Sequence, residues 1–233
     1  MNIFVTGDIH GHLSIDKLSY KNWPESRKLT QDDYLIICGD FGLLWNNPPK
    51  ADELYWLKWL QNRKFTTLVV DGNHENHVML QNLKQIRKFG GTVGQINDKV
   101  YHLKRGQIYT IEDKRIFAFG GAESMDKADR ALGISWWPEE IATFAEMNAA
   151  IDQLQKFNNK VDYIVTHTAP TKYIDKIVPK LFVDLRERMN DPTCKFLDYV
   201  LENIEFKQWF CGHFHMDTTI DNVNFLFNNI VKI

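Results

Sequence analysis

Short apolar runs recur along the chain, and most of them end abruptly in Gly, Asp, Asn or His. Several runs are β-branched and apolar at successive positions, which is typical of strands covered on both faces. The pattern predicts strands at Asn2–Thr6, Tyr34–Cys38, Thr67–Asp71, Gln107–Ile111, Arg115–Phe119, Tyr163–Thr166, Gln208–Cys211, Thr218–Asp221 and Phe225–Asn228. We therefore expect a core built from short, buried strands.

Segments with helical periodicity separate some of these runs. Ala51–Arg63 repeats leucine and tryptophan at helical spacing. Pro138–Phe157 opens with proline at a first helical position, and Asp191-Pro192 indicates the N-cap and first residue of a helix that extends to about Glu202. Strands alternate with helices early and follow one another directly later, which indicates a mixed α/β sandwich. Because no repeat, low-complexity tract or linker interrupts residues 1–233, we expect a single domain.

Composition narrows the choice of partners and location. Apolar residues make up 44% of the chain and charged residues 25%, as in an ordinary globular protein. The formal net charge is −2 with no run of like charges, so duplex nucleic acid is not an expected partner. The cysteines show no paired spacing, and the sequence has neither a signal-peptide pattern nor an apolar run of the roughly 20 residues that span a bilayer. We therefore expect a cytoplasmic protein without a membrane partner, whereas the oligomeric state is not indicated.

Residue types that bind metals follow five of the apolar runs. These segments are Gly7-Asp8-Ile9-His10-Gly11, Gly39-Asp40, Gly72-Asn73-His74-Glu75, Thr166-His167-Thr168 and Gly212-His213-Phe214-His215. Taken singly, each has an ordinary explanation, such as a Gly-Asp turn, an N-cap aspartate, or a histidine that is half-buried or exposed. Side chains at strand ends converge in open sheets, however, and this mixture of imidazole and carboxylate suits Zn, Fe or Mn. The set together predicts a metal site assembled from distant parts of the chain.

The ordered set Asp-x-His, Gly-Asp, Gly-Asn-His-Glu, His and Gly-His-x-His resembles the calcineurin-like metallophosphoesterase superfamily, from Asp8 to His215. The resemblance implies a four-layer α/β fold with two packed mixed β-sheets flanked by helices. It also implies two divalent metal ions, Mn, Fe or Zn, with Mn favoured. By this resemblance, one metal is held by Asp8, His10 and His215, and the other by Asn73, His167 and His213. Asp40 is then the residue that bridges both metals, and His74 is the catalytic histidine rather than a ligand.

These roles describe a metal-dependent phosphoesterase. A pair of divalent ions attracts the phosphate, lowers the pKa of a shared water and positions the resulting hydroxide for in-line attack. His74 follows the ligand Asn73 in the sequence, so it is placed to protonate the leaving-group oxygen. The expected reaction is direct hydrolysis without a covalent enzyme intermediate.

The motifs depart from those of the superfamily's phosphoprotein phosphatases, Gly-Asp-x-Val-Asp-Arg-Gly and Arg-Gly-Asn-His-Glu, whose arginines hold a dianionic monoester. The segments here are Gly39-Asp40-Phe41-Gly42-Leu43-Leu44-Trp45 and Asp71-Gly72-Asn73-His74-Glu75, and both lack the arginine. Asp71 is expected to repel a dianion and to orient a metal ligand or His74. We therefore favour a phosphodiesterase that acts on a small, nucleotide-like phosphate ester.

Three alternatives stay open. The first is a phosphomonoesterase, including a protein phosphatase, which would turn over monoesters faster than diesters. The second belongs to another class: a catalytically silent binding module that keeps the metals as a scaffold, although the loss of ligands typical of such a module is not seen. The third is a nuclease on single strands or RNA ends, which need only a local basic groove.

Residues 120–137 form a long loop with two interpretations. As a substrate cover, the loop places Arg130 on phosphate and a tryptophan of Trp136-Trp137 on a base. As a structural connection, it packs the tryptophans at the start of the next helix and leaves Arg130 solvated. Structural interpretations are preferred for exposed His12 and His77, for His102 and Arg105 before a turn, and for Trp56, Trp59, Cys38 and Cys211 in the core.

Overall fold

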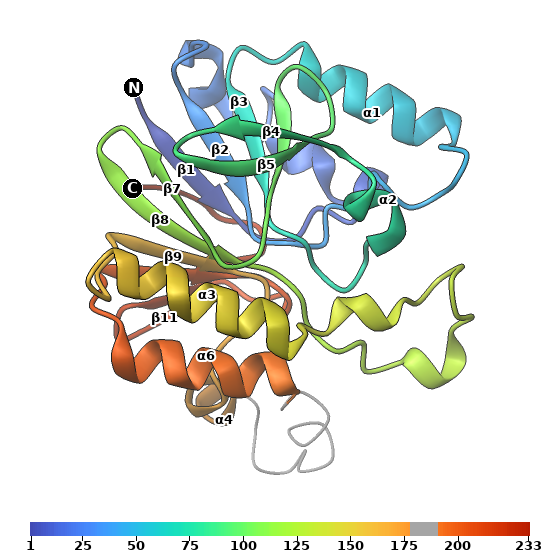
Figure 1. Ribbon diagram of the computed structural model, residues 1–233. Coiled ribbons are helices and arrows are strands. Elements are labelled where there is room, and N and C mark those ends of the chain that lie inside the picture. The colour runs from blue at the N-terminus through green and yellow to red at the C-terminus, as the bar shows by residue number, and fades with distance from the viewer. Residues whose placement is uncertain (178–190) are drawn as a thin grey trace.

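The computed structural model describes residues 1–177 and 191–233, and its described strands form two sheets that face each other (Figure 1). The first sheet contains β1 (Ile3–Thr6), β2 (Tyr34–Ile37), β3 (Thr66–Val69), β4 (Lys84–Lys88), β5 (Gly91–Gln95), β6 (Val100–Leu103) and β13 (Ile230–Lys232). The second contains β7 (Gln107–Ile111), β8 (Lys114–Phe119), β9 (Tyr163–Thr166), β10 (Gln208–Cys211), β11 (Thr218–Ile220) and β12 (Val223–Phe225). Their orders are β13-β1-β2-β3-β6-β5-β4 and β11-β12-β10-β9-β8-β7. Both sheets mix parallel and antiparallel pairs, which confirms the expected α/β class.

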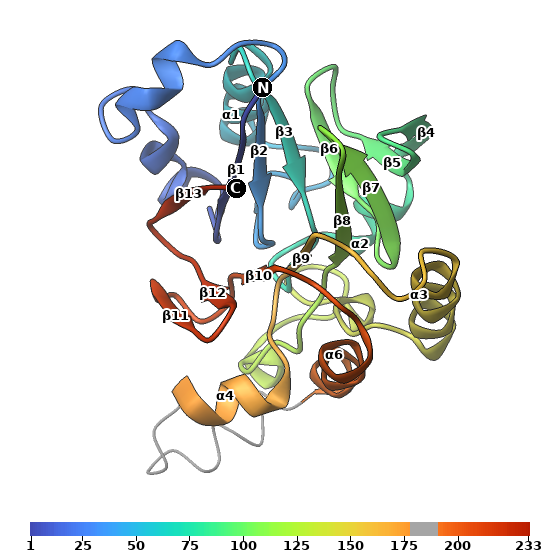
Figure 2. The ribbon, with the colours of Figure 1, turned by 90° about the vertical axis from the view of Figure 1, so that its left-hand side faces the viewer.

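Helices lie on the outer faces of this pair of sheets (Figure 2). The described α-helices are α1 (Ala51–Gln61), α2 (His77–Gln81), α3 (Phe144–Lys156), α4 (Thr171–Ile177) and α6 (Pro192–Asn203). The described 3₁₀ helices are η1 (Gly11–Leu13), η2 (Ile15–Leu18), η3 (Pro24–Lys28), η4 (Lys127–Asp129) and η5 (Pro138–Glu140). Among these elements, none of the helices has the length and apolar character that crossing a bilayer requires.

Three buried clusters define four layers. Because successive side chains of a strand point to opposite faces, Val5 of β1 packs between the two sheets while Phe4 packs on the outer face beneath α1 and the first 3₁₀ helices. In the second sheet, Val165 of β9 likewise faces the first sheet, and Ile164 faces the layer of α3, α4 and α6. Both faces of the central strands are therefore buried, which explains why their sequences are apolar throughout.

The predicted strands agree with the structure for β1, β2, β3 and β7 to β11, and the prediction fails for the other five strands. The expected strand Phe225–Asn228 is wrong, because β12 ends where that range begins. Four strands were not predicted: β4, β5, β6 and β13. β4 has the sequence Lys-Gln-Ile-Arg-Lys at the end of the first sheet, where charged side chains discourage pairing with other chains. Such an edge strand lacks the apolar run on which the sequence prediction depended.

The helix expected over Pro138–Phe157 begins later than predicted. Pro138–Glu140 forms only a 3₁₀ turn, and α3 starts at Phe144. Thr143 accepts a hydrogen bond from the backbone N–H of Glu146, whose carboxylate accepts one from the backbone N–H of Thr143 in return. This capping box fixes the true start of the helix. The expected start at Asp191-Pro192 is correct, since the Asp191 carboxylate accepts a hydrogen bond from the backbone of Cys194 at 2.8 Å.

Candidate metal centre

The loops that follow five parallel strands meet at one place between the sheets. β1, β2 and β3 are parallel neighbours in the first sheet, and β9 and β10 are parallel neighbours in the second. Parallel strands present their carboxyl ends at the same edge. The residues brought together there are Asp8 and His10, Asp40, Asn73 and His74, His167, and His213 and His215. Every residue proposed from the sequence as a ligand or catalytic group thus lies in this one cluster.

The first group of ligand atoms comes from Asp8, His10, Asp40 and His215. One ligand atom from each of the four residues lies within 4.8 Å of those of the other three. His215 Nε2 lies 3.1 Å from a carboxylate oxygen of Asp8 and 2.9 Å from His10 Nε2. This spacing matches several ligand atoms directed at one ion, since metal bonds of about 2.1 Å separate neighbouring ligands by roughly 3 Å.

The second group comes from Asn73, His167 and His213. His167 Nε2 and His213 Nδ1 lie 3.0 Å and 3.1 Å from Asn73 Oδ1. Asp40 lies between the two groups, because its Oδ1 is 3.2 Å from His167 Nε2 and its Oδ2 is 3.7 Å from His10 Nε2. A single buried carboxylate therefore contacts both sets of ligands.

The backbone at the centre is held in strained conformations. The residues with left-handed φ angles are His10 at 47°, Asp40 at 46°, His213 at 67° and His215 at 50°. Such conformations cost a non-glycine residue about 1–2 kcal/mol, and they concentrate where function requires a particular side-chain direction. Gly39 permits a close approach here, since a Cβ at that position would lie 2.2 Å from His167 Nδ1.

The chemistry of the donor set fits a cation. His167 Nδ1 lies 2.8 Å from the backbone carbonyl of Cys38, which can only accept, so Nδ1 carries the proton. In a neutral ring, Nε2 then presents a lone pair towards two oxygen acceptors, those of Asn73 and Asp40. The Asn73 oxygen cannot exchange places with the amide nitrogen without loss, because Nδ2 donates to Ser124 Oγ at 3.2 Å. Three acceptors facing one another require a positive charge among them, which a proton on the ring or a bound divalent ion would supply.

The pKa shifts of the residues at the centre also indicate that positive charge is needed there. Burial lowers the pKa of His167, but the carboxylates of Asp40 and Asp8 raise it by more, to about 10. Burial raises the pKa of Asp40, but His167, His74 and His10 hold it well below its usual range. Burial, with repulsion from His167, lowers the pKa of His213 to about 3, which leaves the neutral imidazole that metals bind. Among the described residues, neither Asp8 nor Asp40 forms an ion pair with lysine or arginine.

His74 lies beside the ligands. Its backbone N–H donates to Asp40 Oδ1 at 2.8 Å, which fixes the residue against the shared carboxylate. Its ring meets His10 edge-on at a centroid distance of 5.1 Å, and its Nε2 accepts a hydrogen bond from Arg130 Nη2 at 3.1 Å. Burial lowers the pKa of His74; Asp40 opposes this shift and Arg130 adds to it. His74 thus lies beside the proposed ligands and carries a ring nitrogen that can exchange a proton.

Other residues that position the ligands were not found from the sequence. Buried Glu75 accepts hydrogen bonds from the backbone of Phe41 at 2.6 Å and Gly42 at 3.4 Å, which holds the loop after Asp40. Ser124, which orients Asn73, donates in turn to Glu140 Oε2 at 2.6 Å. The sequence signal for Glu75 was its place in the Gly-Asn-His-Glu motif, whereas nothing local marks Ser124 or Glu140.

Lys17 forms hydrogen bonds with the backbone next to the centre. Its ammonium group donates to the backbone carbonyls of Gly7 at 3.0 Å, Asp8 at 2.7 Å and Phe227. Burial lowers the pKa of Lys17 to about 8. The lysine therefore ties the end of β1 to a distant segment of the chain without pairing with the Asp8 carboxylate.

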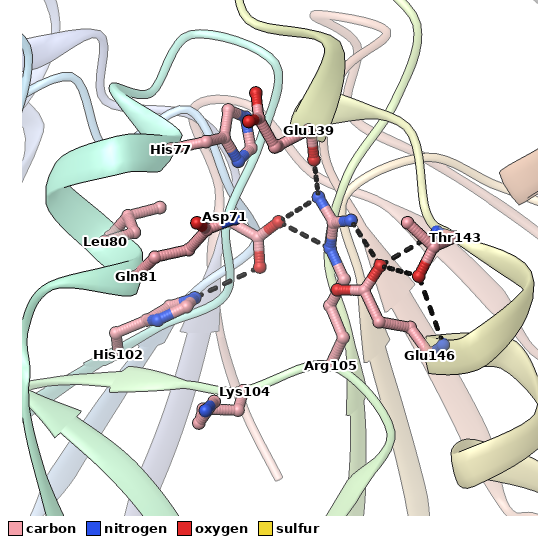
Figure 3. Close-up of a pocket in the computed structure, with 10 residues that line it drawn as sticks. All are labelled: Asp71, His77, Leu80, Gln81, His102, Lys104, Arg105, Glu139, Thr143 and Glu146. Carbon is pink, nitrogen blue, oxygen red and sulfur yellow. Dashed lines mark hydrogen bonds and ion pairs between the residues drawn. The ribbon is translucent and has the colours of Figure 1, made fainter.

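Asp71 does not have the role expected from the sequence. Its carboxylate is paired with Arg105 at 2.6 Å and with His102 at 3.1 Å (Figure 3). Burial raises the pKa of Asp71, but Arg105 and His102 hold it well below its usual range. Among the described residues, the side chain contacts neither a proposed ligand nor His74, and its charge is neutralised internally. The expected repulsion of a dianion is thus wrong, while the structural role of His102 and Arg105 is confirmed.

Of the remaining expectations from the sequence, some are confirmed and others are wrong. His77 is buried, contrary to the expectation of an exposed residue, whereas the His12 side chain is 63% exposed. Cys38 and Cys211 lie in the core as expected. In the loop 120–137, Arg130 is mostly covered and lies against His74 and Asp126. Trp137 is buried, so it has no free face for a base.

Comparison of the sequence with known proteins identifies a family match that covers most of the chain. The family model described as calcineurin-like phosphoesterase matches residues 1–217. No curated protein matches the chain.

Proposed function

The chain belongs to the calcineurin-like phosphoesterase family, and on this basis we propose that it is a phosphodiesterase that acts on small, nucleotide-like diesters with two divalent metal ions. Membership implies metal-dependent hydrolysis of phosphate esters. The diester preference, the pair of metals and the choice of Mn over Fe or Zn belong to the proposal, as does the cytoplasmic location suggested by composition.

The observation that carries the proposal is the place of Asp40 between two ligand groups. Its two oxygens face His167 on one side and His10 on the other. Two such groups, joined by one carboxylate and free of lysine or arginine partners among the described residues, suit a pair of cations. Bound divalent ions supply positive charge for the phosphate and lower the pKa of a shared water.

Each residue at the centre has a proposed role. Asp8, His10 and His215 are the proposed ligands of one ion, and Asn73, His167 and His213 those of the other. His74 is the proposed general acid.

Arg130 contacts this proposed acid. A guanidinium group only donates, so in the present arrangement Arg130 occupies the lone pair of His74 Nε2. A phosphate oxygen is a stronger acceptor for Arg130 than imidazole is. Substrate is thus expected to draw Arg130 towards itself, which frees Nε2 to carry a proton to the leaving oxygen.

The diester preference now depends on the two motif positions and not on the charge of Asp71. Leu44 and Asp71 stand where the phosphoprotein phosphatases carry arginine, so the guanidinium groups that hold a dianion are missing from both loops. One observation favours the alternative of a phosphomonoesterase: Arg130 reaches the centre from residues 120–137. A single arginine can hold either ester, so the two functions need a direct test.

The test compares a diester and a monoester with the same leaving group. Metal-free protein is reconstituted with Mn²⁺ or Zn²⁺ and assayed with bis(p-nitrophenyl) phosphate and p-nitrophenyl phosphate. We expect faster turnover of the diester, and loss of activity on chelation and in Asp40→Ala. A folded, metal-loaded protein that cleaves neither ester would support the silent binding module instead, and faster turnover of the monoester would support the phosphomonoesterase.

We also propose that residues 120–137 cover the centre. The segment contributes Arg130 next to His74 and Ser124 next to Asn73, so it contacts both the proposed acid and a proposed ligand. If Arg130→Ala leaves kcat/KM for the diester unchanged, this role for the segment is wrong.

A further inference from the structure

A pocket of about 300 Å³ opens beside His10 and His74. Its wall also includes Leu13, Trp45 and Lys50. The volume is at the lower end of the range of about 300–1,000 Å³ that is typical of pockets for small molecules. Because the proposed acid His74 lines the pocket, a leaving group that takes its proton would lie here.

Trp45 forms the aromatic wall of this pocket. Its half-buried ring lies nearly parallel to the His74 ring, with an interplanar angle of 25° and a centroid distance of 6.0 Å. Trp137 meets Trp45 edge-on at 5.2 Å and is itself buried. Of these two tryptophans, Trp45 is therefore the one with ring surface open to the pocket. Leu13, which is 73% exposed, adds apolar surface at the mouth.

The segment that carries Trp45 is fixed from both sides. Buried Glu53 accepts hydrogen bonds from the backbone N–H groups of Trp45 at 2.8 Å, Asn46 at 3.0 Å and Lys50 at 2.7 Å. On the other side, Asn76 Nδ2 donates to the backbone carbonyl of Trp45 at 3.0 Å. Asn76 is the N-cap of α2, two residues after His74. The aromatic wall is thus held in place relative to His74 before any ligand binds, which reduces the entropic cost of binding.

The rest of the rim is polar. Lys50 is exposed there, and His12 Nδ1 lies 3.6 Å from the carboxylate of Asp52. An interior that presents the rings of Trp45, His10 and His74, with donors and acceptors at the mouth, matches a molecule with one flat ring system and one hydroxylated end. A nucleoside has this form, with a base that stacks and a ribose that forms hydrogen bonds.

We infer that this pocket is the leaving-group subsite of the enzyme, that it accepts a nucleoside, and that Trp45 determines the preference by stacking on the base. The inference rests on the proposed function, because it takes His74 as the proton donor. In the reaction, the oxygen of a water adds to phosphorus while that water loses one proton to solvent. The P–O bond to the nucleoside breaks, and the leaving oxygen takes a proton from His74, which regains one from solvent. The products are a free nucleoside and a phosphomonoester of the other alcohol.

The first experiment compares two diesters that differ only in the base: adenosine 5′-(methyl phosphate) and ribose 5-(methyl phosphate). The full chain, loaded with Mn²⁺, is assayed for kcat/KM and for products. We expect kcat/KM for the adenosine diester to be about tenfold higher, since loss of a stacked base costs a factor of this order. We expect the products to be adenosine and methyl phosphate, rather than adenosine monophosphate and methanol.

Variants assign the preference to one ring. Trp45→Ala should reduce the ratio of the two kcat/KM values to near unity, mainly through a higher KM for the adenosine diester. Trp45→Phe retains an aromatic face and should keep most of the ratio. Trp56→Ala is the matched control, because Trp56 lies on α1 outside the pocket and should leave the ratio unchanged.

A binding measurement keeps the inference testable where turnover is too slow to measure. Adenosine should quench the tryptophan fluorescence of the metal-loaded protein, and Trp45→Ala should weaken its binding about tenfold. Equal kcat/KM for the two diesters, release of methanol in place of adenosine, or adenosine binding that is unaffected by Trp45→Ala would each overturn the subsite. None of these results would contradict the phosphodiesterase proposal. That proposal fails separately if bis(p-nitrophenyl) phosphate is not cleaved.

Discussion

Two buried clusters combine aspartates that follow strands with histidines, but the negative charge of the aspartates is compensated in different ways. At the centre, Asp8 and Asp40 face histidines only, among the residues that the structure describes. In the neighbouring cluster, Asp71 faces His102 together with Arg105, whose guanidinium group supplies a full positive charge (Figure 3). One cluster has a permanent cation of its own, and the other has none among the described residues.

This difference teaches how a carboxylate after a strand should be interpreted. Asp8, Asp40 and Asp71 all follow strands of the first sheet, and each lies next to a glycine. The distinguishing feature is whether the chain provides its own permanent cation. A buried carboxylate without one is unstable unless protons or metal ions compensate it. The comparison therefore predicts opposite consequences for the same substitution in the two clusters.

The largest effect is expected for Asp40→Asn. Loss of the shared carboxylate should remove both ions and lower kcat/KM for the diester by about 10⁴-fold, equivalent to roughly 5 kcal/mol of transition-state stabilisation. The fold should persist, because the lost charge has no buried lysine or arginine partner among the described residues. Metal content measured by elemental analysis, with circular dichroism for the fold, checks both parts. Full metal content in this variant would contradict the place given to Asp40.

Asp71→Asn should have the opposite result. The substitution leaves buried Arg105 with Glu146, 3.5 Å away, in place of its closer ionic partner, so the free energy of unfolding should fall by about 3 kcal/mol. Urea denaturation measures the loss, and metal content should stay at the wild-type value. The double variant Asp71→Leu with Arg105→Met removes both charges and should recover most of the stability. Because the pKa of Asp71 is depressed in the folded state, the contribution of the pair is present at neutral pH and is lost progressively as pH falls from the ordinary aspartate pKa to that depressed value.

Chelation should separate the two clusters without any mutation. Removal of divalent ions is expected to lower the free energy of unfolding of the wild-type protein by about 2–3 kcal/mol for each ion bound, if the metal is present at roughly 100 times its Kd. Asp71→Asn should show the same decrease, and Asp40→Asn none. Thermal unfolding with and without chelator gives the comparison. An equal response of Asp40→Asn and wild type would mean that the ions bind elsewhere.

The smallest effect concerns Arg130, which approaches the centre without pairing with its carboxylates. Arg130→Gln should lower kcat/KM about tenfold, near 1.4 kcal/mol. A general acid works only when protonated, so activity falls as pH rises through its pKa. Since Arg130 lowers the pKa of His74, its removal should raise that pKa and move the alkaline limb of the pH profile to higher pH. Arg130→Lys keeps the charge and should leave the limb in place; a shift in Arg130→Lys as large as in Arg130→Gln would exclude a charge effect.

Part of the fold and most of the candidate site could be predicted from sequence because each depended on a local pattern. Central strands such as β2 and β9 are apolar at successive positions, and the proposed ligands follow them within a few residues. The prediction failed where a partner decided the outcome. α3 starts at Phe144 because Thr143 and Glu146 cap each other. The charged edge strand β4 exists because β5 pairs with it.

The sequence by itself determined the types and order of the proposed ligands and the absence of arginine from two motifs, since these properties belong to single residues and short segments. The tertiary structure decided that Asp71 is neutralised by Arg105, that Arg130 reaches His74, and that Trp45 lines the pocket beside it. These contacts join segments separated by 34, 56 and about 29 positions, over which no local pattern specifies a partner. Charge balance at a buried site is a property of what surrounds a residue, and only the folded chain determines those surroundings.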